Sequence, residues 1–341
     1  MLAGGAALLV GCTCGRSADP VLERGVSALW ALQAEDGGWH SRTYGFLAPG
    51  ETLTAFALAT LARVPDLAPA AGLSRALSFL TERGRDGSLG LGGLASEYPT
   101  YATGLGLGCL ARAGVEPAVQ AAMRAWLLGQ QRLGAQWGPA DGGFPMGSAA
   151  APPVPPAHPG HVDLSMTRRA IEGLCAGGWS GPARDGALRY VRRSQRSDGS
   201  FVYSAVEDAL NKGGRGDDGP QGYGSATADG VLAALALGER ALAESGANAL
   251  RQMHRLDGNP RLGQQHQGFV PAMRGYYLAG AAAVFAALGG PPGWAEALGE
   301  AVRAGQGADG LWRNPVTLQK EDDPLIASPL ALSALLDAAS A

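Results

Sequence analysis

Two kinds of apolar stretch alternate along this chain of 341 residues. In the first kind, apolar residues recur three and four positions apart, with Arg and Glu between them. This spacing predicts helices that bury one face and expose the other. Such helices are predicted over residues 21–33, 73–83, 119–131, 185–195, 241–255 and 294–306.

The second kind of stretch follows each of the first and is apolar on almost every face. These stretches are rich in Ala and Gly, and a helix that is apolar all round is a buried helix. They predict inner helices over residues 51–63, 98–113, 163–176, 225–237, 274–288 and 324–338. Six outer helices alternating with six inner helices predict two concentric rings. We therefore expect a single-domain, all-α fold, an (α/α)6 toroid.

An Asp-Gly pair follows each predicted outer helix and marks six repeats, which we place at 20–66, 67–115, 116–179, 180–240, 241–290 and 291–341. In four repeats the pair stands between a Gln and an aromatic residue. Asp can accept bonds from backbone N–H groups, Gly tolerates a left-handed conformation, and the aromatic ring can pack on the preceding helix. We assign these turns to Gln33, Asp36, Trp39, Asp86, Gln136, Trp137, Asp141, Phe144, Gln195, Asp198, Phe201, Asp257, Gln306, Asp309 and Trp312.

The Gln-x-x-Asp-Gly-x-Trp turns resemble the QW repeats of squalene-hopene cyclases and the related repeats of protein prenyltransferase β subunits. The resemblance spans about residues 20–341. The segment Asn259-Pro-Arg-Leu-Gly with Tyr276-Tyr277, and the closing repeat with Glu321-Asp-Asp-Pro324, also resemble bacterial single-toroid members of this superfamily. The resemblance implies a toroid with an apolar central cavity, suited to an isoprenoid-like ligand.

The catalytic motifs of these relatives are incomplete in this chain. Squalene cyclases protonate an alkene with a D-x-D-D motif, and the segment His161-Val-Asp163-Leu-Ser165 keeps only its middle Asp. A single Asp at a helix start is stabilised as an anion, which makes it a poor strong acid. Prenyltransferases need an Asp-x-Cys pair for zinc, and Ser165 stands in place of the Cys. Neither activity is expected, and we predict no metal and no cofactor.

Candidate site residues cluster before the inner helices, because the loops entering those helices should emerge at one end of the ring. Long loops on a rigid scaffold commonly carry sites. We expect an acidic and aromatic collar there, including Glu51, Glu97 and Asp229. The ligand-binding candidates are Tyr98, Tyr101, His161, Arg168, Tyr223, Arg274, Tyr276 and Tyr277, and the catalytic candidates are Asp163, Asp322 and Asp323. The structural alternatives are helix caps for the three Asp residues and cavity wall for Tyr276 and Tyr277.

The first ten residues are apolar and lead into Leu9-Val-Gly-Cys12, which resembles the lipobox of bacterial lipoproteins. This predicts a signal and tether over residues 1–19, lipidation at Cys12 and a membrane contact through that anchor alone, at the bacterial cell envelope. Without such a signal the protein would be cytoplasmic. The four cysteines form no disulfide or zinc pattern.

Composition limits the partners further. Charged residues make up 17% of the chain and apolar residues 46%, which excludes a disordered protein. The net charge of −3 gives no electrostatic basis for binding nucleic acid.

Three functions are therefore compatible with the chain. The first is a toroid that holds an apolar or isoprenoid small molecule, with or without chemistry at Asp163. The second is a carbohydrate-active hydrolase or lyase that uses two carboxylates, such as Asp163 and Asp322, at a defined separation. The third is a binding or scaffold protein without catalysis, which the incomplete acid and zinc motifs favour.

Overall fold

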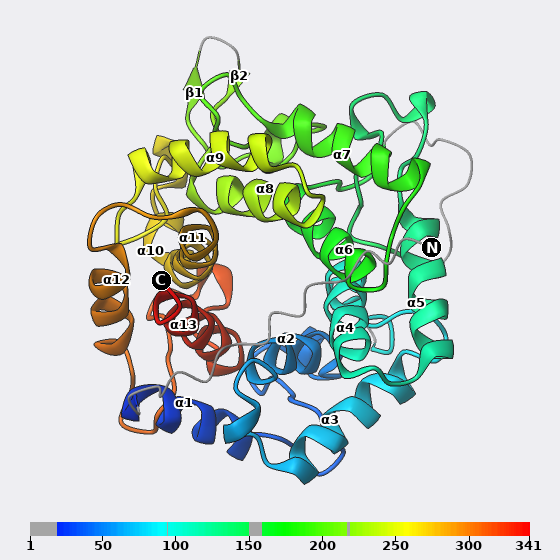
Figure 1. The fold of residues 1–341 in the computed structure, drawn as a ribbon, viewed down its shortest axis with the longest axis vertical. Coiled ribbons are helices and arrows are strands. Elements are labelled where there is room, and N and C mark those ends of the chain that lie inside the picture. The colour runs from blue at the N-terminus through cyan, green and yellow to red at the C-terminus, as the bar shows by residue number, and fades with distance from the viewer. Residues whose placement is uncertain (1–18, 94, 150–158, 217–218) are drawn as a thin grey trace, which may run out of the picture.

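The computed structural model describes residues 19–93, 95–149, 159–216 and 219–341, and over these residues two concentric rings of helices surround one axis (Figure 1). The predicted all-α toroid is confirmed. The outer ring contains α1 (Pro20–Ala31), α3 (Ala70–Arg83), α5 (Pro117–Gln130), α7 (Pro182–Ser194), α9 (Arg240–Met253) and α12 (Trp294–Arg303). The inner ring contains α2 (Glu51–Leu61), α4 (Pro99–Ala113), α6 (Leu164–Ala176), α8 (Gly224–Ala236), α11 (Arg274–Leu288) and α13 (Pro324–Ala338).

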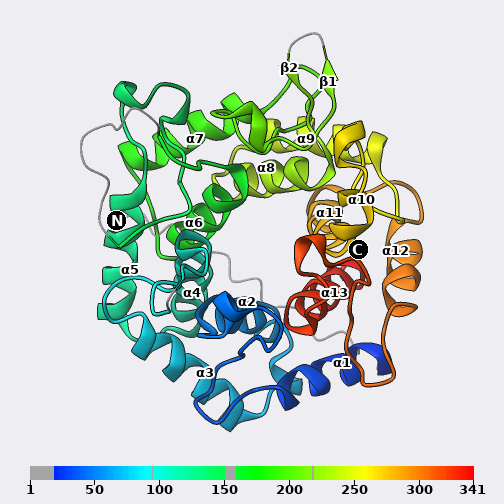
Figure 2. The ribbon, with the colours of Figure 1, turned by 180° about the vertical axis from the view of Figure 1, so that it is seen from behind.

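The inner ring is closed. Each inner helix packs on the next one, and α13 packs on α2, so that the ring has no open edge in either view (Figure 2). Glycine allows the inner helices α4 and α6 to approach each other closely. A Cβ at Gly104 of α4 would overlap the backbone of Arg169 in α6, and a Cβ at Gly173 of α6 would overlap Gly104. This contact explains the small residues in the inner stretches.

Short elements interrupt the loops between the two rings. They are α10 (Phe269–Ala272), six 3-10 turns and a hairpin of β1 (Arg215–Gly216) and β2 (Gly219–Pro220), which projects from the ring beside α9 (Figure 1). They were not predicted, because two to six residues carry no measurable periodicity. Five of the six outer helices also begin earlier than predicted. In three of them Pro20, Pro117 and Pro182 occupy the first helical turn. Proline is well suited to that turn, where its missing N–H would have no partner.

The glutamine of each complete turn bridges two outer helices. Gln33 Nε2 donates to the carbonyl oxygens of Gly37 in its own turn (3.0 Å) and Gly72 in α3 (2.8 Å). Gln195 forms the same pair of bonds, and Gln306 bonds Gly310 and Val21 of α1, thereby joining the last repeat to the first.

The third repeat departs from the predicted assignment. Gln131 makes the bridging bonds there, at 2.9 Å to Gly142 O and 2.8 Å to Ala183 O. Gln136 bonds Leu133 O instead, and Trp137 lies against the Arg132 guanidinium at 4.7 Å. The reason is an inserted 3-10 turn, Ala135–Ala140, which separates the bridging glutamine from the Asp-Gly pair.

Five of the six turns are also bonded to the inner helix that follows them. The backbone N–H three residues after the turn Asp donates to a hydroxyl one turn into that helix, as Trp39 does to Thr54 (2.9 Å) and Phe201 does to Thr227 (3.1 Å). The turn residues therefore hold the scaffold and do not enter the central cavity. The Asp257 turn lacks this pattern, and its carboxylate pairs with Arg255 on the surface.

No described helix is long and apolar enough to cross a membrane. The predicted lipidation site, Cys12, lies outside the described residues.

Candidate ligand-binding cavity

A cavity of about 250 Å³ opens on the ring axis, at the end where the inner helices begin. Its wall is mostly aromatic and aliphatic, with few charged groups. Five tyrosines line it: Tyr98, Tyr101, Tyr203, Tyr223 and Tyr276. Apolar side chains supply much of the remaining wall: Leu47, Leu53, Phe56, Met166, Met273, Ile326 and Leu330. Such a surface favours an apolar ligand over a strongly hydrated one.

Asp229 lies in the wall of this cavity and is 2% exposed. Arg168 Nη1 donates to its carboxylate at 2.8 Å, and the Tyr276 hydroxyl lies 3.0 and 3.1 Å from its two oxygens. Since the Tyr276 proton points to Asp229, Ser165 Oγ donates to the Tyr276 oxygen at 2.8 Å. Burial raises the pKa of the Asp229 carboxyl, and Arg168 opposes that effect. The Asp229 carboxylate therefore accepts its hydrogen bonds from two groups of the protein itself, Arg168 and Tyr276.

A second chamber, of about 210 Å³, lies on the same axis where the inner helices end. Phe56, Tyr276 and Leu330 line both chambers and form the waist between them. Glu172 lies beside the waist and bonds both Arg168 (2.7 Å) and Arg169 (2.8 Å). Burial acts to raise the pKa of Glu172, but the two guanidiniums prevail and lower it to about 2.

Three carboxylates near the starts of the inner helices cap helices: Glu97 and Asp323 of the predicted acidic collar, and Glu321, which also lines the cavity. Glu97 accepts from Thr52 N of α2 at 2.9 Å, and Glu321 accepts from the first N–H groups of α11 at 2.8 and 2.9 Å. Asp323 caps its own helix through Leu325 N (2.9 Å). Glu97 and Glu321 thus each lie in the loop before one inner helix and cap the inner helix that precedes it in the chain. Their oxygens satisfy N–H groups that would otherwise lack partners.

The other carboxylates named from the sequence also have protein partners. Asp322 accepts from the Tyr44 hydroxyl at 2.6 Å, and burial together with that carboxylate raises the pKa of Tyr44 to about 12. Glu51 accepts from Gly90 N. Asp163 is fully buried and caps α6 through Met166 N at 2.9 Å. None of these three lines the axial cavity.

His161 does not line the cavity and lies between Asp163 and Tyr203, which does. Its Nε2 is 3.1 Å from Asp163 Oδ2 and 3.4 Å from the Tyr203 hydroxyl. The contact with the Asp163 carboxylate raises the pKa of His161, although partial burial acts in the other direction. The folded protein therefore binds a proton at His161 more tightly than a free imidazole does.

Replacing His161 by Gln should lower stability more at pH 5.5 than at pH 8.5. A folded-state pKa above the usual value of about 6.5 stabilises the protein fully below that value, and the contribution is lost as pH rises through the folded-state pKa. Urea unfolding of both proteins at the two pH values measures this difference. His254→Gln is the control, and its loss of stability should change with pH in the opposite direction, because burial lowers the pKa of His254. Equal losses for His161→Gln at both pH values would contradict the prediction.

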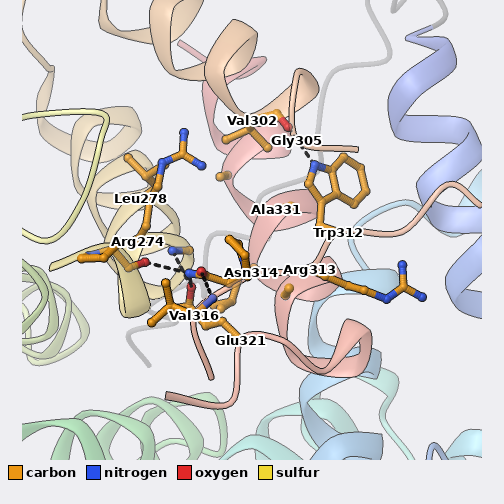
Figure 3. A pocket seen from close by; sticks show the side chains of 16 residues that line it. Arg274, Leu278, Val302, Gly305, Trp312, Arg313, Asn314, Val316, Glu321 and Ala331 are labelled. Atoms are coloured by element: carbon orange, nitrogen blue, oxygen red, sulfur yellow. Dashed lines mark hydrogen bonds between the residues drawn. The ribbon is translucent and has the colours of Figure 1, made fainter. Parts of the chain in front are cut away.

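Two predicted ligand-binding residues lie off the axis. Arg274 donates to Leu256 O (2.7 Å) and Ala301 O (3.3 Å), and the Tyr277 hydroxyl bonds His254 Nδ1 at 2.8 Å. Arg274 lines a separate cavity of about 230 Å³ between α11, α12 and α13 (Figure 3). There Asn314 Nδ2 bonds Glu321 at 3.0 Å, and the Trp312 indole bonds Val302 O at 2.7 Å. These polar groups already bond other groups of the protein, so the axial cavity is the better candidate site.

Several lining residues were not named as candidates from the sequence, among them the loop residues Tyr203, Lys212 and Lys320. Each of these three lies in a loop without helical periodicity, so nothing in the apolar pattern indicates its direction. The one available signal was composition, because Lys212 and Lys320 are the only lysines in the chain. Among the described residues no group of three His, Cys, Asp or Glu side chains could hold a metal ion.

No protein-family model matches this chain, and no curated protein matches its sequence. Solved structures share its fold. A variant of the type II terpene cyclase MstE from Scytonema, in complex with geranylgeranyl dihydroxybenzoate, has a TM-score of 0.62 and 15% identity, covering 94% of this chain and 96% of that one. A protein from Actinoplanes (0.60, 20%, covering 94% and 99%) and a glycosidase (0.57, 13%, covering 94% and 96%) are also similar. At these identities the similarity establishes a shared toroid fold.

Proposed function

We propose that the axial cavity binds an apolar, isoprenoid-like ligand, and that the protein is a single-toroid member of the squalene-cyclase and prenyltransferase repeat group. The observation that carries the proposal is the cavity wall, in which five tyrosines and a set of aliphatic and methionine side chains surround the axis. Burial of a hydrocarbon chain against such a wall is favourable by about 25 cal/mol per Å². A geranylgeranyl compound as the substrate of MstE supports the same ligand class.

Ligand binding is better supported than proton-transfer catalysis. A general acid must carry a proton at the reacting atom. Asp229 accepts from Arg168 and Tyr276, and Asp163 accepts from Met166 N and contacts His161, so that both carboxyls are arranged as acceptors. We therefore propose a binding role in which neither residue protonates the ligand.

Carbohydrate hydrolysis is the second candidate, because a glycosidase has the same fold. Hydrolysis needs two carboxyl groups that face the substrate at a defined separation. The two carboxylates in the cavity wall, Asp229 and Glu321, already accept bonds from Arg168 and from the start of α11. The apolar ligand is therefore preferred.

Binding of geranylgeraniol and of a malto-oligosaccharide to the purified protein tests this proposal, together with mass spectrometry of the lipids that co-purify. We expect geranylgeraniol to bind and the sugar not to bind. Phe56→Asn should weaken geranylgeraniol binding about tenfold, because loss of one aromatic contact that the ligand would bury costs at least about 1.4 kcal/mol. Leu67→Asn, at a 39% exposed surface position, is the control and should leave binding unchanged. Binding of the sugar alone would overturn the proposal.

A further inference from the structure

The only two lysines of the chain both line the mouth of the axial cavity. Lys212 Nζ lies 5.7 Å from the ring centre of Tyr203 and 5.2 Å from that of Phe269. Lys320 Nζ lies 5.6 Å from Phe46 and 5.9 Å from Tyr98. The two residues come from loops more than a hundred positions apart, so the ring closure alone places them at one opening.

Neither ammonium is neutralised by a described carboxylate, because no ion pair joins Lys212 or Lys320 to Asp or Glu in the described part of the chain. The nearby acids have other partners. Asp229 pairs with Arg168, Glu321 caps α11, and Asp163, the one acid that acts on Lys212 through space, contacts His161. Two positive charges therefore remain at the cavity mouth.

The surrounding helices add to this positive potential. The inner helices all start at this end of the ring, and a helix start carries roughly half a positive charge from its N–H groups. Glu97, Glu321, Asp163 and Asp323 offset part of that charge. Burial also lowers the pKa of Lys212, which indicates that this ammonium lacks the solvent that normally stabilises it. An anion placed between the helix starts and the lysines would restore that stabilisation.

Backbone strain is concentrated at the same place. Lys320 and Tyr98 are two of four non-glycine residues with positive φ among the described residues, at 62° and 61°. A left-handed conformation costs a non-glycine residue of the order of 1 kcal/mol, and glycine would relieve it. Strained residues are typical of functional sites, where the side chain is needed in spite of the cost.

We propose that Lys212 and Lys320 bind the anionic head group of an amphipathic ligand whose hydrocarbon part occupies the axial cavity. This inference rests on the proposed function, because the apolar cavity must hold the tail. The head group is a carboxylate or a phosphate monoester, since both present oxygen atoms to a compact ammonium. The use of Lys at these two positions, against Arg at all other basic positions, fits a point charge that can be partly desolvated over an aromatic ring.

Calorimetric binding of geranylgeraniol, geranylgeranoic acid and geranylgeranyl monophosphate tests the head-group inference. These probes share one tail and differ in the head. We expect at least one anionic probe to bind about tenfold or more tightly than the alcohol, in line with one or two charge-assisted bonds. The tighter of the two anions identifies the head group. Its advantage over the alcohol should decrease with added salt.

Lys212→Gln and Lys320→Gln should each reduce affinity for the preferred anion about tenfold while leaving affinity for the alcohol unchanged. The unchanged alcohol binding also shows that the variant is folded. Lys320→Arg, which keeps the charge, should retain most of the preference. Arg240→Gln, which removes a 72% exposed charge from α9, is the control and should change neither affinity.

The outcomes separate the two proposals. If the alcohol binds as tightly as both anions, the head-group inference fails and the proposed function stands. If a lysine variant weakens alcohol and anion equally, the lysines support the cavity wall only, and the inference is overturned. If none of the three probes binds, both proposals fail.

Discussion

Replacing Glu172 by Gln should lower the free energy of unfolding at pH 7 by about 3 kcal/mol, at the lower end of the range for breaking a buried ion pair. Glu172 bonds both Arg168 and Arg169, whose side chains are only 10% and 13% exposed. Loss of its charge would leave two buried guanidiniums beside Asp229 as the remaining carboxylate of the cluster. The lower end applies because Glu172 itself is 25% exposed to the second chamber.

The pH dependence of this loss has a definite sign. The two arginines lower the folded-state pKa of Glu172 to about 2, below its usual value near 4.5. The ionised carboxylate therefore stabilises the protein above about pH 4.5, and this contribution is lost as pH falls toward 2. The gap in unfolding free energy between the native protein and Glu172→Gln should decrease over that interval.

Urea unfolding at several pH values measures the effect, with Glu244→Gln as the matched control. Glu244 pairs with Arg240 on the surface, where the exposed fractions are 39% and 72%, so its replacement should cost less than about 0.5 kcal/mol. In an Arg169→Met background the cost of Glu172→Gln should be smaller, because one of its two partners is already absent. Equal costs for Glu172→Gln and Glu244→Gln would show that the central cluster contributes nothing to stability.

Replacing Gly142 by Ala should destabilise the protein by about 2 to 5 kcal/mol, from a left-handed backbone and from overpacking together. Gly142 has φ of +90°, and a Cβ there would overlap the carbonyl oxygen of Gly186 in α7. That oxygen belongs to a helix backbone, so it cannot move without shifting α7 against the ring.

Thermal and urea unfolding of Gly142→Ala can be compared with Gly114→Ala. Gly114 also has positive φ, at +66°, but a Cβ there meets no described atom within 4 Å. Its replacement should cost about 1 kcal/mol from the backbone conformation alone. A similar loss at both positions would mean that the approach of the turn to α7 has no energetic role.

The repeat pattern explains why the fold could be predicted so closely. The predicted inner helices at 274–288 and 324–338 coincide with α11 and α13. Periodicity reports which faces of a helix are buried, and burial on one face or on all faces distinguishes the outer from the inner ring. The starts of the outer helices were predicted less accurately, because the apolar pattern does not register a proline in the first turn, such as Pro182.

The cavity was predictable only where a lining residue lies on an inner helix or at its start. Tyr98, Tyr101, Tyr223, Asp229 and Tyr276 were named from the sequence and line the cavity. The carboxylates were harder to place. An acidic residue before an inner helix can face the axis or the start of the neighbouring helix, and Glu97 takes the second option at Thr52, 45 residues away.

The sequence by itself determined the architecture: six alternating pairs of helices, their turns and the apolar inner ring. These features follow from local spacing, which records burial one residue at a time. The tertiary structure alone decided which polar groups remain available to a ligand. Ring closure brings Lys212 and Lys320 to one opening and turns the predicted acidic collar largely into helix caps. A hydrogen bond or charge pair between distant segments depends on where their backbones meet, and spacing along the chain carries no record of that meeting.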